Sequence, residues 1–345
     1  MLASRIRPNK LGLDIGGTLV KVAALKGHTQ LWRNLLLEHT DVIKIGKHEE
    51  VKVGYTKSVT DVLEALSRVD VGSKVHVTGG GAYKYDKEIR NSLDFGNKDT
   101  EVVKVCELGS IAEGTLALIE HTDLDLYTYR TKEGAIMAGE KTRSEFPKLI
   151  VNVGSGASYI LCKSGYPSPN YTRVTGTMVS GGTLLGLSNL IYNKHMDYST
   201  MLQKADKGDL KNVDILVKDI YGSDSGFQID GDIVAGTLCK IPDLAKEENG
   251  IENIRKEDVL HSIGFMVSAN ISHIAVLSAQ LHKSKQIIFT GNFGAGNDHL
   301  MDSLTFGVDF HSQGYKVPGS EKGGIPCYFL DKAGYSGAIS CLLKE

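Results

Sequence analysis

The chain has 345 residues, 41% of them hydrophobic and 23% charged, and its formal net charge is −2. This composition is typical of a globular protein and excludes a basic surface suited to nucleic acid. A chain of this length exceeds the size at which one hydrophobic core stops growing, which favours two lobes with a cleft between them.

Cysteine usage and hydropathy bear on the compartment. The five cysteines are scattered, without disulfide or metal-ligand spacing, which favours a reducing environment. The basic start at residues 1–10 lacks the apolar core of a signal sequence, and no stretch approaches the length of a membrane span. We therefore expect a cytoplasmic protein with no membrane span.

Short apolar runs alternate with helical patterns along the chain, which predicts an α/β fold. Strands are expected at residues 11–14, 19–25, 74–77, 149–153, 159–162 and 286–290. Helices are expected at residues 58–69, 107–119 and 259–281, where apolar side chains recur near helical spacing. The last of these helices is long enough to pack a lobe core or a dimer interface.

The first two strands enclose a break that is suited to binding phosphate. The string LGLDIGGTLVK, residues 11–21, is an apolar strand that stops at two glycines and then resumes. Glycine lets backbone amides approach an oxyanion closely, and a carboxylate before the turn would face the metal that accompanies phosphates. An ordinary hairpin with a solvated carboxylate at the strand end is the alternative. The residues expected at the phosphates are Asp14, Gly16, Gly17, Thr18 and Lys21, with Asp14 on the metal, directly or through water.

A run of three glycines, Gly79 to Gly81, closes the third expected strand. Three glycines exceed what a simple turn needs and suit the close approach of backbone to a ligand. We expect Gly80 and Gly81 to contact the substrate. A flexible loop is the alternative.

The middle of the chain repeats the logic of the first hairpin. Residues 149–162 form an apolar strand, a Gly-Ser-Gly break and a returning strand, and Gly154, Ser155 and Gly156 are expected at the phosphates. Two such hairpins predict an internal duplication, as in the group of actin, the heat-shock ATPases and the sugar kinases. A polar segment precedes the second hairpin, so we place the lobes at residues 1–145 and 146–345.

Two later glycine motifs complete the expected nucleotide site. Gly181 and Gly182 open an apolar helix whose N-terminus would point free amides toward an anion, although a glycine cap on a core helix fits equally well. Gly291 and Asn292 follow another apolar strand, where the base and ribose would rest unless the segment is a loop. No segment fits a Walker P-loop or a Rossmann turn, so phosphate binding would fall to the distributed hairpins.

With these segments in place, the chain resembles the eukaryotic-type (type II) pantothenate kinases from the first hairpin to the C-terminus. Two strings, RVTGT at residues 173–177 and VKDIYG at residues 217–222, lie outside the generic nucleotide motifs and are the most specific. The other motifs that carry the resemblance are DIGGTLVK (14–21), TGGGAYKY (78–85), NVGSG (152–156), NVD (212–214), GNF (291–293) and GYSGA (334–338).

The resemblance implies a homodimer with a two-lobed, actin-like fold that transfers the γ-phosphoryl group of ATP to pantothenate, the first step of coenzyme A synthesis. It also implies Mg²⁺ and feedback inhibition by coenzyme A or its thioesters. The family's catalytic base matches Glu107, its substrate-binding arginine matches Arg173, and its Gly-Ser-Gly serine matches Ser155. The metal-side carboxylate and phosphate-side lysine match Asp14 and Lys21. Without the resemblance, Glu107 would be a common first-turn helix carboxylate and Arg173 a solvated strand residue.

The chain departs from the family pattern at two places. The string VSGG at residues 179–182 stands where the family usually has three glycines, so Ser180 adds a side chain near the expected phosphate path. Residues 331–337 replace a more acidic and aromatic string, which bears on the acyl or pantothenate end of the pocket. The main alternative function is a catalytically weak, nucleotide-binding regulatory subunit of a hetero-oligomeric pantothenate kinase. A kinase of the same fold that acts on a sugar is a third interpretation.

Overall fold

The computed structural model describes residues 9–46, 49–96, 100–130, 133–222, 229–294, 296–318 and 323–345, so most of the basic start lies outside the described residues. All of the expected strands and helices are present, within a few residues of their predicted bounds. Ser58 caps the helix predicted at residues 58–69, because its hydroxyl accepts a hydrogen bond from the Asp61 amide at 3.1 Å. The α/β prediction is confirmed.

The N-terminal part of the chain forms a six-stranded sheet with the order β3-β4-β2-β1-β5-β6. β1 and β2 form the first hairpin, and β5 runs parallel to β1 on its other side. The strands are β1 (Leu11–Ile15), β2 (Val20–Leu25), β3 (His39–Ile45), β4 (Glu49–Thr56), β5 (Lys74–Thr78) and β6 (Glu101–Lys104).

The rest of the chain contributes a seven-stranded sheet with the order β11-β10-β9-β14-β15-β7-β8. β9 and β10 form the second hairpin, and β14 runs parallel to β9. The strands are β7 (Leu126–Arg130), β8 (Gly134–Met137), β9 (Lys148–Val153), β10 (Ala157–Cys162), β11 (Tyr171–Thr177), β14 (Gln286–Gly291) and β15 (Cys327–Leu330). β12 (Ile215–Leu216) and β13 (Val234–Gly236) pair separately.

The two large sheets repeat one connection pattern. In each sheet a hairpin, β1–β2 or β9–β10, gains a third antiparallel strand, β4 or β11, and two parallel strands, β5–β6 or β14–β15. The last parallel strand is followed in each half by a helix, α5 (Glu107–His121) or α14 (Ser336–Leu343). This repetition confirms the predicted duplication and the two-lobed, actin-like architecture.

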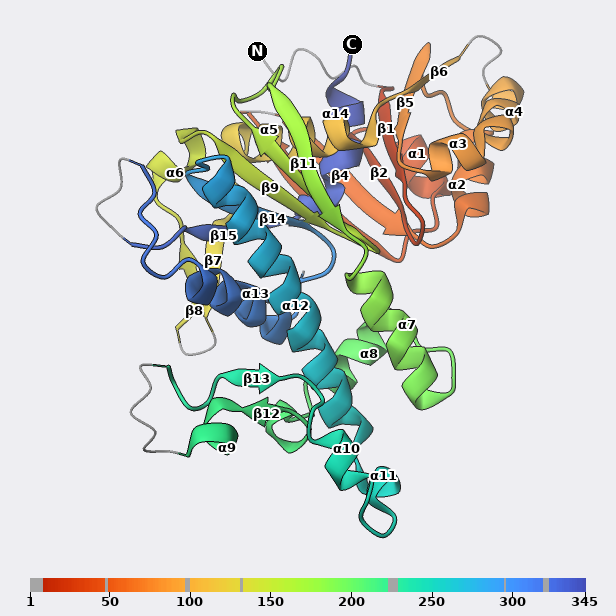
Figure 1. The fold of residues 1–345 in the computed structure, drawn as a ribbon. Coiled ribbons are helices and arrows are strands. Elements are labelled where there is room, and N and C mark those ends of the chain that lie inside the picture. The colour runs from red at the N-terminus through yellow and green to blue at the C-terminus, as the bar shows by residue number, and fades with distance from the viewer. Residues whose placement is uncertain are drawn as a thin grey trace.

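The helices α5 and α14 pack against each other between the two sheets (Figure 1). Their buried side chains, Ile111, Leu116 and Ile339 among them, share one core with the inner faces of both sheets. The packing is so close that a Cβ at Gly12 of β1 would overlap the Ala338 carbonyl of α14. The lobes therefore meet at a dry junction built on β1, α5 and α14.

Separate helices cover the outer face of each sheet. The first sheet is covered by α1 (Thr29–Asn34), α2 (Val59–Leu66) and α4 (Asp86–Gly96), and the second by α12 (Lys256–Leu281) and α13 (Asp298–His311). α3 (Gly81–Lys84) follows β5, α6 (Glu140–Ser144) precedes β9, and η3 (Ala333–Tyr335) precedes α14. The remaining helices form an extension around one end of α12 (Figure 1): α7 (Gly181–Tyr192), α8 (Tyr198–Ala205), η2 (Leu210–Asn212), α9 (Val217–Tyr221), α10 (Ile241–Leu244) and α11 (Gly250–Asn253).

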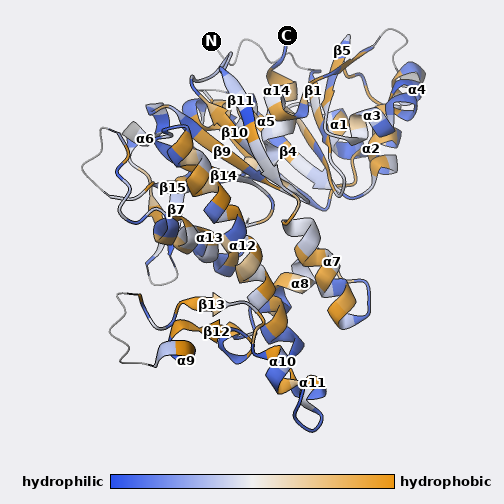
Figure 2. Cartoon of the chain, in the orientation of Figure 1, coloured by the Kyte–Doolittle hydropathy of each residue, from blue (hydrophilic) through white to orange (hydrophobic). Residues whose placement is uncertain are grey.

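Apolar residues run along both α7 and α12 (Figure 2). Within the described residues, α12 alone has the length and composition of a membrane span, and 56% of its apolar window is buried inside the protein. Core helices pass the same test, and Leu260, Val267 and Ile271 of α12 belong to the core beneath the second sheet. The packing of α12 is therefore that of a core helix.

The expected boundary between the lobes, at residue 145, does not separate the segments that pack with each sheet. β7 and β8 precede that residue but belong to the second sheet, because β7 pairs with β15. α14 comes from the other end of the chain and packs on β1 of the first sheet. Lobes of residues 1–145 and 146–345 stay a prediction.

Candidate active site

The first hairpin presents one carboxylate toward the junction between the lobes. Leu13 and Ile15 point into the outer core, so the alternate residues Gly12 and Asp14 point to the face where α14 lies. Asp14 stands opposite Lys21 in the hairpin, and their Oδ2 and Nζ atoms are 3.4 Å apart. Their side chains are only 13% and 18% exposed, so the ion pair is shielded from bulk water.

Two glycines from distant parts of the chain pack directly on the Asp14 carboxylate. A Cβ at Gly79, in the three-glycine run, would lie 2.9 Å from Asp14 Oδ1, and a Cβ at Gly337, in the first turn of α14, would lie 2.8 Å from Oδ2. Real Cβ atoms do not approach so closely, so a side chain at either position would displace the carboxylate. Backbone from β5 and α14 thus fixes Asp14 from two sides.

Glu107 is the first residue of α5. The start of this helix is tied to β5, because the Thr78 hydroxyl donates to the Val105 carbonyl at 3.1 Å, and Thr78 is the partner of Asp14 in the sheet. Partial burial raises the pKa of Glu107, and the charge of Asp14 raises it further, while Lys21 lowers it. Its side chain remains accessible to solvent. Glu107, Asp14 and Lys21 therefore form one electrostatic cluster.

Arg173 lies exposed on the edge strand β11. Tyr171, two residues earlier on the same face of the strand, packs against α5, and a Cβ at Gly109 would lie 2.5 Å from its hydroxyl. Arg173 thus lies on the side of the strand that faces the start of α5, with its guanidinium folded over Gly176. Its contact with a substrate stays a prediction.

The second hairpin is held by the start of α7. The amides of Gly181 and Gly182 donate to the carbonyls of Gly154 and Ser155, at 3.1 and 3.0 Å. Both positions require glycine, since a Cβ on either would lie 2.8 Å from the carbonyl oxygen it faces. The expectation that these two amides are free for an anion is therefore wrong. They hold the hairpin instead.

Gly291 and Asn292 take the place in the second sheet that Gly79 and Gly80 take in the first. Gly79 and Gly291 have φ values of +85° and +89°, and each packs over a carbonyl of the neighbouring strand. Asn292 contacts Gly334, which precedes α14. Gly334 thus contacts Asn292, which is expected at the base and ribose, and Gly337 contacts Asp14, which is expected at the phosphates. In the sequence both glycines lie in the string GYSGA and in the divergent segment 331–337, and their i, i+3 spacing was the available signal.

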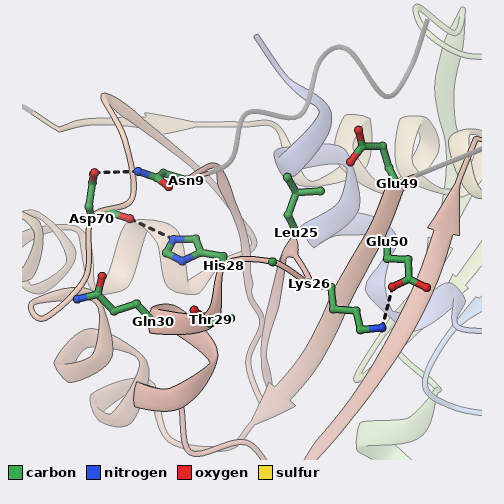
Figure 3. Close-up of a pocket in the computed structure, with 10 residues that line it drawn as sticks. Asn9, Leu25, Lys26, His28, Thr29, Gln30, Glu49, Glu50 and Asp70 are labelled. Atoms are coloured by element: carbon green, nitrogen blue, oxygen red, sulfur yellow. Dashed lines mark hydrogen bonds and ion pairs between the residues drawn. The ribbon is translucent and has the colours of Figure 1, made fainter.

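A surface hollow lies at the opposite end of the β1–β2 hairpin from Asp14 (Figure 3). Leu25 lines it and is the last residue of β2, next to Ala24, which pairs with Leu11 at the open end of the hairpin. Three polar residues on one side of the hollow are hydrogen-bonded to one another. The Asn9 side chain donates to Asp70 at 2.8 Å, and His28 Nε2 lies 3.1 Å from the Asp70 carbonyl. The hollow is therefore separate from the cluster around Glu107.

No group of three or more histidine, cysteine or acidic side chains converges on one point within the described residues. Mg²⁺ is commonly held by one or two carboxylates together with water and substrate phosphates. Asp14, a single carboxylate fixed at the turn of a phosphate-type hairpin, fits that requirement. The chemistry of this donor set suits Mg²⁺ that arrives with a nucleotide.

The fold and the site define a two-lobed α/β protein with a glycine hairpin in each lobe and an acidic cluster beside the first. The chain belongs to the Fumble family, whose profile matches residues 10–344.

Three curated relatives carry pantothenate or phosphopantetheine in their names. The chain is 28% identical over 356 residues to mouse (Mus musculus) 4'-phosphopantetheine phosphatase, and 31% over 277 and 29% over 357 residues to pantothenate kinases 2 and 1 of Arabidopsis thaliana. The alignments cover 97%, 78% and 95% of this chain, and 40%, 28% and 84% of the three relatives. The chain thus spans less than half of the first two.

Solved structures that resemble this chain include two proteins of the ROK family. The hexokinase from Thermus thermophilus has a TM-score of 0.47 and 11% identity, with 97% of each chain covered. The glucokinase from Streptomyces griseus has a TM-score of 0.46 and 12% identity, with 96% of this chain and 97% of that chain covered.

Proposed function

We propose that this protein is an ATP-dependent pantothenate kinase, which transfers the γ-phosphoryl group of ATP to the primary hydroxyl of pantothenate. The observation that carries the proposal is the cluster of Glu107, Asp14 and Lys21, in which an accessible carboxylate with a raised pKa stands beside a fixed carboxylate–ammonium pair. Membership of the Fumble family and the names of the Arabidopsis relatives support pantothenate as the acceptor.

Glu107 is the general base in this proposal. A base for an alcohol must be within reach of the hydroxyl, must be ionised and gains from a pKa closer to the working pH. Burial and the Asp14 charge move the pKa of Glu107 in that direction, and its place in the first turn of α5 leaves the carboxylate accessible to solvent. Glu107 then accepts the hydroxyl proton as the oxygen attacks phosphorus.

Asp14 and Lys21 handle the charge of the nucleotide. Phosphoryl transfer depends mainly on positioning and on neutralising the phosphate oxygens. Mg²⁺, when bound, supplies charge neutralisation between the phosphates, and Asp14 is the residue that would hold it. Lys21 contributes a positive charge to the same oxygens, and the amides of the exposed residues Gly17, Ser155 and Gly156 would provide uncharged donors.

The acceptor side is assigned to Arg173, together with Gly80 and Gly81. The guanidinium fork suits the carboxylate of pantothenate, which supports an acceptor-binding role for Arg173 beside α5. A homodimer in the cytoplasm, with feedback inhibition by coenzyme A or its thioesters, completes the proposal.

The test is phosphopantothenate formation from ATP, Mg²⁺ and pantothenate by the purified protein. Glu107→Gln should lower kcat about 100-fold or more, because the amide cannot accept the proton. Glu101→Gln is the matched control, since Glu101 is an exposed carboxylate on the preceding strand whose partner is Lys74 at 3.7 Å. No product from the wild-type protein would overturn the proposed function, and equal rates for Glu107→Gln and wild type would overturn the assigned base.

A catalytically weak regulatory subunit is the second candidate. It predicts ATP binding without phosphopantothenate formation by the isolated chain, and a gain in rate when an active partner is added. The presence of Glu107, Asp14 and Lys21 in one cluster favours the active enzyme.

A further inference from the structure

We propose that Ser180 and the first turn of α7 are positioning elements for the nucleotide phosphates, because they aim the amides of the second hairpin. The inference rests on the proposed function in one respect, which is that this protein binds ATP. It assigns a role to the residue at which the chain departs from the three-glycine pattern of its family.

Three donors converge on the tip of the second hairpin. Ser180 Oγ donates to the Gly154 carbonyl at 3.1 Å, which also accepts the Gly181 amide at 3.1 Å. The Gly182 amide binds the next carbonyl, that of Ser155, at 3.0 Å. Ser180 is 0% exposed, so its hydroxyl faces the hairpin and not an open phosphate path. Two consecutive peptide groups of the hairpin are thus held on one side.

The turn that carries Ser180 is itself fixed. The Ser180 amide donates to the Thr183 hydroxyl at 3.3 Å, and that hydroxyl donates to the Met178 carbonyl at 2.9 Å. The amide of Val179 donates to the Thr177 hydroxyl at 3.1 Å, which ties the turn to the end of β11. The hairpin is therefore anchored on a braced segment.

The anchored carbonyls determine where the neighbouring amides point. In a trans peptide group the C=O and the following N–H point in opposite directions. Because the Gly154 and Ser155 carbonyls point at α7, the N–H groups of Ser155 and Gly156 point away from α7. Both residues are exposed, and consecutive amides that point outward form a concavity that suits an oxyanion.

Ser180 adds a hydrogen bond that a glycine at this position cannot make. Without this hydrogen bond the Gly154 carbonyl keeps only the Gly181 amide as a donor, so the hairpin is less rigidly held. The affinity for phosphate should then fall about fivefold. The effect should be confined to ligands that carry phosphates, because the hydroxyl acts only through the hairpin.

The experiment measures the affinity of the full chain for MgATP and for adenosine by isothermal titration calorimetry. Ser180→Ala should weaken MgATP binding about fivefold and leave adenosine binding unchanged. Ser188→Ala is the control, because Ser188 is a buried serine on the same helix whose hydroxyl donates to the Leu184 carbonyl of that helix at 2.6 Å. It should change neither affinity.

A second variant, Ser180→Gly, covers the case in which the alanine protein does not fold, because it restores the family's three glycines. The same selective loss of MgATP affinity is expected. Unchanged MgATP affinity in the folded variants, or an equal loss for MgATP and adenosine, would overturn the inference. A wild-type protein that binds ATP but makes no phosphopantothenate would overturn only the proposed function, so the two failures are distinguishable.

Discussion

The two glycine hairpins share a backbone plan but differ in charge. In the first, Asp14 stands beside Thr78 of the parallel strand and opposite Lys21, with the charged atoms 3.4 Å apart. In the second, Asn152 stands beside Thr290, whose hydroxyl donates to its side-chain oxygen at 3.2 Å, and no charge is present on either residue. The two hairpins thus have the same strand arrangement but different side chains at the equivalent positions.

This difference indicates a division of labour between the lobes. The first hairpin can neutralise phosphate charge and meet a cation, whereas the second can offer only backbone amides and hydroxyls. Glu107 begins the helix that follows the last strand of the first sheet, so all three charged residues of this cluster come from the first half of the chain. In the proposed enzyme the second hairpin would then be a neutral support for the phosphates, held by the start of α7.

The largest expected difference between the two hairpins is the effect on kcat of changing the charge at their equivalent strand positions. Asp14→Asn should lower kcat about 100-fold or more, because the only carboxylate of either hairpin turn is removed while its shape is kept. Asn152→Asp is the matched variant and should change kcat far less, since the second hairpin is not used for charge. Steady-state kinetics over a range of Mg²⁺ concentrations checks both. Equal losses in the two variants would mean that both hairpins carry charge chemistry.

The shared backbone plan can be tested at the glycines that follow the two parallel strands. Gly79→Ala and Gly291→Ala should each lower the free energy of unfolding by about 1–3 kcal/mol, because both have positive φ and both abut a strand carbonyl. Gly186→Ala is the control, since nothing lies within 4 Å of a Cβ at that helical position. Urea denaturation followed by circular dichroism gives the three values. A loss at only one of the paired glycines would contradict the structural equivalence.

The smallest expected effect concerns the titration of Glu107. Its pKa should lie above the ordinary value of 4.5, fall in Asp14→Asn and rise in Lys21→Met, as read by carbon NMR of the carboxyl group. Because the pKa of Glu107 is higher in the folded state than in the unfolded state, Glu107 contributes most to the free energy of unfolding below pH 4.5. This contribution is lost as the pH rises through the folded-state pKa. Activity should follow the opposite course, since the base must be ionised. If the pKa of Glu107 is the same in both variants as in the wild type, Glu107 does not interact electrostatically with Asp14 and Lys21.

Strand positions and the duplication were predictable from the sequence because they depend on local patterns. Each hairpin is an apolar run, a glycine break and a second apolar run, and that pattern specifies strands and turn without any long-range contact. Glu107 and Arg173 were reached through the family resemblance, since neither residue type stands out by spacing alone.

Contacts between segments far apart in the chain were not predictable. The packing of Gly337 on Asp14 joins the two ends of the chain, and no periodicity within α14 reports on a carboxylate in β1. The partners of the amides at the start of α7 were not predictable for the same reason. A helix N-terminus has unpaired amides, but their partner, here the Gly154 and Ser155 carbonyls, depends on tertiary structure.

The position of α14 has a consequence for synthesis. Its helix covers the inner face of β1 so closely that Gly12 has no room for a side chain. The first sheet therefore cannot bury that face until nearly all of the described chain has left the ribosome. Such a delay exposes apolar strands during translation and slows folding, since loop closure over most of the chain must precede the contact. Released chains that stop before residue 336 should accordingly stay bound to chaperones for longer than released chains that include α14.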